Sequence, residues 1–189
     1  MSELKTLKLL TGNTGKLKEI RRWLEPLGIE VVLLDLPFIE TQVDSLDEVI
    51  INGMEILELR EHTDGAFIKD DSGLFIEALA GFPGVYSSYV QRSIGNKGIL
   101  RLMEGIENRN ASFRTVIGLY LPDEGVSLFR GECRGTISME ERGKQGFGYD
   151  PIFIPRGEDR TFAEMSLREK NDISHRIMAI RGLVDFLSL

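Results

Sequence analysis

The sequence predicts an α/β protein, in which a β-sheet is flanked by helices. In the first half, short apolar runs of strand length alternate with segments whose apolar residues recur at helical spacing. Such alternation is typical of a sheet with helices packed against it and with functional groups at the strand ends. In the middle, two long β-rich runs separated by a turn predict an antiparallel hairpin. The length of 189 residues is sufficient for one large core, so residues 1–189 are expected to form one domain.

The elements follow each other in a simple order. Strands are predicted at residues 6–10, 29–34, 66–68, 111–121 and 126–138, and helices at residues 17–27, 46–57 and 173–187. The segment from Ser166 to Glu169 is a capping box that begins a short helix containing Lys170. Residues 143–160 are rich in glycine, proline and charge, and are predicted to form a long loop of the kind that is often functional.

Composition excludes several classes of protein. The formal net charge of −7 argues against a general nucleic-acid binder, which needs a basic face. No apolar run approaches the length of a membrane span, and the N-terminus has no secretory signal pattern. Cys133 is the only cysteine, which excludes an intramolecular disulfide and fits a reducing compartment. We therefore expect a cytoplasmic protein that binds neither nucleic acid nor membrane.

A loop between the first strand and the first helix carries several polar groups. Free amide groups at a helix start, together with a lysine, would suit a phosphate. The loop is not a Walker A motif, because its glycines are too close together and Leu17 stands where a metal-binding hydroxyl should be. A plain turn into the helix is the alternative. The residues of the loop are Thr11, Gly12, Asn13, Thr14, Gly15 and Lys16.

An acidic pair follows the third predicted strand. Asp70 and Asp71 precede Ser72, and two adjacent carboxylates need a cation or a raised pKa if they are buried. Glu40, in an earlier loop, could complete a set of oxygen ligands for Mg²⁺. The alternative is a solvated turn, since Asp, Ser and Gly all favour turns.

Two further segments have the composition of a base-binding pocket. The loop from Gly146 to Pro151 combines a flexible backbone with two aromatic rings and a carboxylate, although a structural turn with buried rings has the same composition. His175 and Arg176 begin the last helix and could donate hydrogen bonds to an oxygen-rich ligand. The alternative is that Ser174 caps this helix and that its neighbours are solvated.

Together these segments closely resemble the inosine triphosphate pyrophosphatase family, in an archaeal-like form. The motifs TGNTGK, DDSGL, ALAGFPGVYS, GFGYDPIF and FAEMSLREKNDISHR occur in the family order and cover nearly the whole chain. The resemblance implies an elongated, two-lobed single domain with a long mixed sheet and an active site in the cleft between the lobes. It also implies a homodimer.

The resemblance implies a role for each motif. Glu40 and Asp71 would bind Mg²⁺, with Mn²⁺ as a possible substitute, and Asp71 would also accept the proton of the attacking water, supported by Asp70. The substrate, a purine nucleoside triphosphate such as ITP, dITP or XTP, would be hydrolysed to monophosphate and pyrophosphate. Its binding residues would be Thr11, Gly12, Asn13, Thr14, Gly15, Lys16, Ser72, Phe147, Gly148, Tyr149, Asp150, Lys170, His175 and Arg176.

The chain departs from the family at one position. Bacterial and eukaryotic members usually carry a lysine on the helix after the glutamate loop, whereas residues 49–54 of this chain contain no basic residue. Neutralisation of the phosphates is therefore expected to depend more on the metal, Lys16 and Lys170.

Two other functions stay open. One is a Maf-type pyrophosphatase acting on pyrimidine or modified nucleotides, against which the FGYDP loop and the Ser174-His175-Arg176 segment argue. The other is a sensor that binds nucleotides without hydrolysis, against which the acidic set argues.

Overall fold

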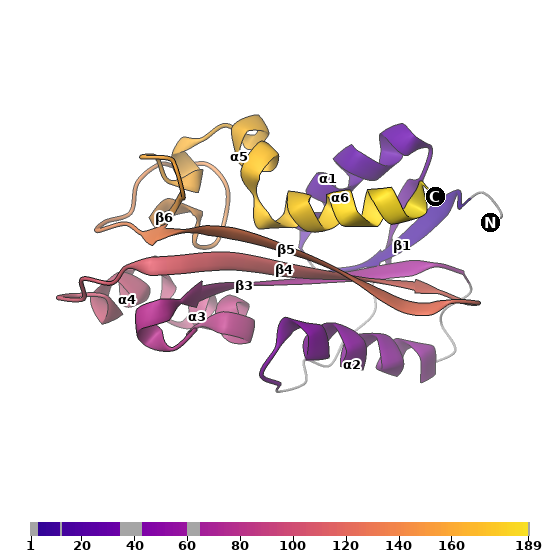
Figure 1. The fold of residues 1–189 in the computed structure, drawn as a ribbon, viewed down its shortest axis with the longest axis horizontal. Helices are drawn as coiled ribbons and strands as arrows, with labels where there is room; N and C mark the ends of the chain where they lie inside the picture. The colour runs from indigo at the N-terminus through magenta and orange to yellow at the C-terminus, as the bar shows by residue number, and fades with distance from the viewer. Residues whose placement is uncertain (1–3, 12, 35–42, 60–64, 189) are drawn as a thin grey trace. The chain divides into compact units, whose positions relative to one another are not determined.

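The computed structural model describes residues 4–11, 13–34, 43–59 and 65–188. Its strands form a six-stranded sheet in the order β2-β1-β3-β4-β5-β6 (Figure 1). β1 is parallel to both β2 and β3, and β5 is antiparallel to β6, so the sheet is mixed. The strands are β1 (Thr6–Leu10), β2 (Glu30–Leu34), β3 (Phe67–Ile76), β4 (Asn110–Leu121), β5 (Gly125–Ile137) and β6 (Phe153–Pro155).

Six α-helices accompany these strands in the described part of the chain. They are α1 (Thr14–Leu24), α2 (Leu46–Leu59), α3 (Ser87–Ser93), α4 (Gly95–Leu102), α5 (Leu167–Ile173) and α6 (His175–Leu187). The chain divides into two compact units. The first comprises residues 1–71, 116–130 and 179–189, and the second comprises residues 72–115 and 131–178. The chain passes from one unit to the other within β3, β4, β5 and α6.

In the first unit, helices cover both faces of the sheet. α1 and the C-terminal part of α6 lie on one face, and α2 lies on the other (Figure 1). The Arg181 guanidinium of α6 lies 5.7 Å from the centre of the Trp23 ring of α1. In the register of β1 and β3, Leu10 is paired with Lys69. Because parallel strands end at the same edge of a sheet, the loop after β1 begins next to Asp70.

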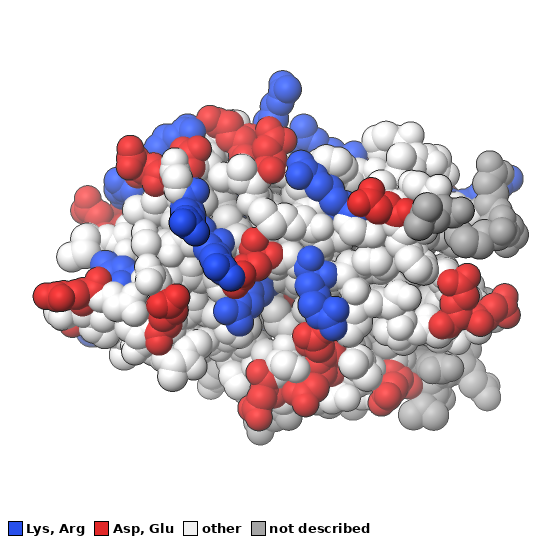
Figure 2. Space-filling model, viewed as in Figure 1, with Lys and Arg blue, Asp and Glu red and all other residues white. Residues whose placement is uncertain are grey.

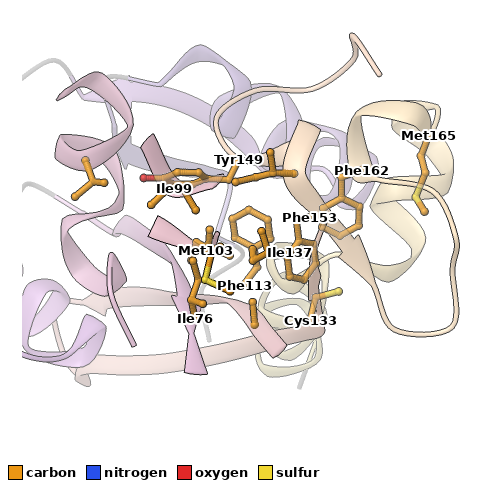
Figure 3. Packing of buried hydrophobic residues seen from close by; sticks show 14 residues of the cluster. Ile76, Ile99, Met103, Phe113, Cys133, Ile137, Tyr149, Phe153, Phe162 and Met165 are labelled. Carbon is orange, nitrogen blue, oxygen red and sulfur yellow. The ribbon is translucent and has the colours of Figure 1, made fainter. Parts of the chain in front are cut away.

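The second unit has its own hydrophobic core. The rings of Phe113, Phe153 and Phe162 gather at its centre, with centroids 4.6 to 6.0 Å apart (Figure 3). Cys133 is buried in the same cluster, and burial raises the pKa of its thiol to about 11. Its residues come from β3, β4 and β5, from α3, α4 and the turn after α4, and from the segments after β5.

The fold class predicted from the sequence is confirmed, and so are the hairpin of β4 and β5 and the capping box before α5. Two predictions were wrong. The third strand does not end at residue 68 but runs to Ile76, so the acidic pair lies within a strand. The long loop at residues 143–160 contains β6, which pairs with β5. The cleft between lobes and the single domain over residues 1–189 stay predictions.

Two further properties of the described residues concern membrane spans and surface charge. None of the helices they form is long and apolar enough to span a membrane. On the face drawn in Figure 2, basic side chains lie among acidic ones.

The packing of β4 on α2 generates a stability prediction. A Cβ added at Gly118 would lie 2.7 Å from Sδ of Met54, which is too close for a van der Waals contact. Gly118→Ala should therefore lower the free energy of unfolding by about 1–3 kcal/mol, measured by urea denaturation.

Gly182 in α6 offers a matched control. A Cβ at this position would meet its nearest atom, in Phe129, at an ordinary 3.5 Å. Gly182→Ala should stabilise the protein by about 0.5–1 kcal/mol, because alanine favours helices. Equal effects of the two substitutions would show that the packing of β4 on α2 is not the cause.

Candidate active site

The loop after β1 is organised by Asn13, which caps α1. Its side-chain oxygen accepts hydrogen bonds from the backbone N–H groups of Gly15 (2.8 Å) and Lys16 (3.3 Å). The Thr11 hydroxyl accepts a hydrogen bond from Asn13 N–H at 3.1 Å. The expectation that the amides at the start of this helix are free is therefore wrong for Gly15 and Lys16. Asn13 satisfies them, as a capping side chain does. Gly12 lies outside the described residues.

Lys16 binds the acidic pair. Its ammonium lies 3.0 Å from Oδ1 of Asp70 and 3.8 Å from Oδ1 of Asp71, and it also donates to the Asp70 carbonyl oxygen at 3.1 Å. The side chain of Asp70 is fully buried, while that of Asp71 is 27% exposed. The solvated turn is therefore excluded, and Lys16 is the cation that a buried carboxylate requires.

The acidic pair has the donor chemistry of a magnesium site. Mg²⁺ in enzymes is commonly held by one or two carboxylates, with the remaining positions taken by water and substrate phosphates. The side chain of Asp71 is partly exposed, and Asp70 lies beside it in β3. Glu40, the other predicted ligand, lies outside the described residues. Within the described ranges, no group of three or more His, Cys, Asp or Glu side chains forms a metal-binding cluster.

In the second unit, Arg176 is directed at Ser72. The arginine is 2% exposed, and its Nη2 atom donates to the Ser72 hydroxyl at 2.8 Å. This hydroxyl also contacts the hydroxyl of Thr115 on β4. Because Ser72 directly follows Asp71 in β3, these contacts fix the strand immediately after the acidic pair.

His175 is a buried residue rather than a solvated one. Its ring stacks on Phe113 with centroids 4.8 Å apart and an interplanar angle of 11°. The Ser174 hydroxyl accepts a hydrogen bond from Ile177 N–H at 3.4 Å and so caps α6. Capping by Ser174 is thus confirmed. Solvation of His175 and Arg176 is not, because both are buried.

Asp150 and Lys170 form a buried ion pair in the same unit. The Lys170 ammonium lies 2.7 Å from Oδ2 of Asp150, and both side chains are less than 5% exposed. The same oxygen accepts a hydrogen bond from Phe147 N–H at 2.8 Å. A Cβ at Gly146 would collide with this carboxylate, which explains why glycine occupies the position. The ammonium also lies 4.7 Å from the centre of the Phe147 ring, which is partly exposed.

Tyr149 belongs to the core in the structure. Figure 3 shows its ring among the buried apolar side chains. Its hydroxyl donates to the Ser87 carbonyl oxygen at 2.9 Å, and burial raises the pKa of the phenol. The Gly148 carbonyl oxygen accepts hydrogen bonds from Gln91 at 2.9 Å and from Asn96 at 3.2 Å. The loop is therefore held by side chains of α3 and α4, and Phe147 remains its exposed ring.

Sequence reasoning missed several residues that build these sites. Phe113 and Thr115 lie in β4, whose sequence pattern does not indicate their contacts with His175 and Ser72. Gln91 and Asn96 lie on short helices without a motif. An open hollow of about 820 Å³ in the second unit was also not predicted. It contains none of the predicted site residues, and its lining includes Phe75, Arg114, Glu132, Arg134 and Arg156.

The fold and these polar groups define a known class of α/β protein. The chain belongs to the Ham1 family, whose model matches residues 7–186. It is similar over 97% of its length to the Ham1 protein of Staphylococcus aureus, with a TM-score of 0.85, 31% identity and 98% of that chain covered. A Ham1 protein from Coxiella burnetii gives the same TM-score and coverage at 34% identity.

Curated relatives are more similar in sequence. A protein of Thermococcus kodakarensis named dITP/XTP pyrophosphatase is 51% identical over 181 residues, which is 96% of each chain. A protein of the same name from Pyrococcus horikoshii is 49% identical over 180 residues, which is 95% of each chain.

The buried ion pair generates a second stability prediction. Lys170→Met keeps the length of the side chain but leaves the Asp150 carboxylate buried without its ammonium partner. The free energy of unfolding should fall by about 3–5 kcal/mol, measured by urea denaturation.

The double variant Lys170→Met with Asp150→Asn serves as the control, because it removes both charges and keeps an acceptor for Phe147 N–H. It should regain more than half of the lost stability. A double variant no more stable than Lys170→Met would contradict the assignment of the loss to an unpaired charge.

Proposed function

We propose that this chain hydrolyses non-canonical purine nucleoside triphosphates, such as ITP, dITP and XTP, to the monophosphate and pyrophosphate. The observation that carries the proposal is the carboxylate pair of β3, neutralised by Lys16, in a chain about half identical to proteins named dITP/XTP pyrophosphatase. The reaction would remove these nucleotides from the cellular pool. Cytoplasmic location and a homodimer are part of the same proposal.

The two carboxylates support different roles in this reaction. Asp70 is fully buried and held by Lys16, so it serves to position the pair. Asp71 is more accessible and farther from the ammonium, so it serves as proton acceptor and metal ligand. Mg²⁺, or Mn²⁺ in its place, would be held by Asp71 and Glu40. When bound, the ion supplies positive charge that stabilises the phosphate oxygens.

The proposed chemistry is a single displacement by water. Asp71 takes a proton from the water, whose oxygen forms a bond to the α-phosphorus. The bond from this phosphorus to the bridging oxygen breaks, and pyrophosphate leaves with that oxygen. No covalent intermediate with the protein is needed. Lys16 and the loop from Thr11 to Gly15 would lie along the phosphates.

The second unit supplies the groups proposed to bind the base. Phe147 offers an exposed ring for stacking, and the buried charges of Lys170 and Asp150 hold its loop in place. His175 and Arg176 would donate to the 6-oxo group of hypoxanthine or xanthine. Adenine carries an amino group there, which would leave these donors unpaired and reduce its binding.

The alternatives from the sequence have less support. A Maf-type pyrophosphatase is disfavoured because the chain belongs to the Ham1 family and its relatives from Thermococcus kodakarensis and Pyrococcus horikoshii are named for dITP and XTP. A nucleotide sensor without turnover would not require an accessible carboxylate beside a buried one.

Turnover of a nucleotide panel tests the proposal. With Mg²⁺, the protein should release pyrophosphate from dITP, ITP and XTP at least about tenfold faster than from dATP or dTTP. Asp71→Asn should lower kcat on dITP by about 10²–10⁴-fold, since it removes the base and a metal-ligand charge. Pyrophosphate release is measured by a coupled assay.

Asp123→Asn, in the exposed turn between β4 and β5, is the matched control and should leave kcat unchanged. Preferred hydrolysis of dTTP would favour the Maf-type alternative. Binding of dITP without pyrophosphate release would favour the sensor.

A further inference from the structure

Lys69 is a lysine buried in a strand. It lies in β3 directly before the acidic pair and is 6% exposed. Its ammonium donates to the carbonyl oxygen of Val49, in the first turn of α2, at 3.2 Å. Burial of an ammonium is costly, and an aliphatic side chain would fill a strand position between sheet and helix without this cost. Packing alone therefore does not explain why a lysine occupies this position.

Gly53 on α2 makes room for this side chain. A Cβ at Gly53 would lie 2.7 Å from Cε of Lys69 and 3.1 Å from its ammonium nitrogen. Glycine in a helix interior costs about 1 kcal/mol relative to alanine. The residue of α2 that lies against the Lys69 side chain is therefore one with a low helix propensity.

The side chain of Lys69 lies on the same side of β3 as that of Asp71. Side chains alternate along a strand, so residues 69 and 71 share one face and residue 70 points to the other. Contacts agree with this alternation, because Asp70 meets Lys16 of α1 while Lys69 meets α2, and these helices lie on opposite faces of the sheet (Figure 1). Lys16 therefore meets the acidic pair from the α1 side, and Lys69 lies on the α2 side, the face of β3 to which residue 71 also belongs.

These placements give α2 a positive charge that its own sequence lacks. Residues 49–54 of α2 contain no lysine or arginine. The structure brings the ammonium of Lys69 to this part of the helix from β3.

We propose that Lys69 supplies the positive charge on the α2 side of Asp71 that binds the phosphates of the substrate, and that Gly53 is the space it needs. This proposal rests on the proposed function for the identity of the substrate. Lys69 would then bind phosphate in addition to Lys16. The glycine at position 53 of α2 would serve the same site by leaving space for the Lys69 side chain.

The first test removes the positive charge of Lys69. Lys69→Met removes the charge and keeps the length of the side chain. It should raise KM for dITP and weaken binding of inorganic pyrophosphate, measured by calorimetry with Mg²⁺, by about tenfold or more, with a smaller effect on kcat. Lys18→Met, an exposed lysine of α1, is the control with the same charge change and should alter neither.

A pair of double variants separates charge from packing. Lys69→Val clears the space around residue 53, so that Gly53→Lys can return the charge from α2, whereas Gly53→Gln returns a neutral side chain of similar length. The lysine double variant should recover most of the lost pyrophosphate affinity, and the glutamine double variant should not. Thermal unfolding of each variant shows whether it is folded, and this comparison decides the matter even if Lys69→Met alone does not fold.

Two results would overturn the proposal. One is a Lys69→Met variant with reduced stability but unchanged KM and pyrophosphate affinity. The other is equal recovery by the lysine and glutamine double variants. Because pyrophosphate binding is measured without turnover, a wild-type protein that binds pyrophosphate but does not hydrolyse dITP would contradict the proposed function and still allow Lys69 to be judged.

Discussion

The structure of the candidate active site depends on the ion pair between Lys16 and Asp70. Two adjacent carboxylates in a sheet repel each other, and one of them is fully buried. The ammonium of Lys16 compensates both, and it can do so because β1 and β3 are parallel neighbours that end at the same edge. Asn13 fixes the start of α1 and thereby the position of Lys16. Capping, register and charge together leave Asp71 as the more accessible carboxylate.

Much of the fold could be predicted because its signals are local. The apolar patterns of β1, α2 and the hairpin of β4 and β5 predicted these elements, and the capping box predicted the start of α5. The error in β3 has a physical reason. Asp, Ser and Gly favour turns, but at residues 70–73 pairing with neighbouring strands and the Lys16 ion pair override that preference. β6 was missed because its three residues follow a proline-containing turn.

The site could be predicted only as a list of residues. Motifs identified Asp70, Asp71 and Lys16, but not that the lysine neutralises the carboxylates. They identified Asp150 and Lys170, but not that the two form a buried pair. Contacts between residues far apart in the chain, such as Phe113 with His175 or Lys69 with α2, leave no trace in local sequence patterns. Their functional meaning depends on geometry, which only the folded chain provides.

In the proposed reaction, the carboxylate pair directs water to the α-phosphorus of a purine nucleoside triphosphate. Hydrolysis of dITP in water labelled with ¹⁸O, followed by mass spectrometry of both products, shows which phosphorus the water attacks. Attack at the α-phosphorus places the label in the nucleoside monophosphate and leaves the pyrophosphate unlabelled. Label in the pyrophosphate, or release of single phosphates, would exclude this reaction.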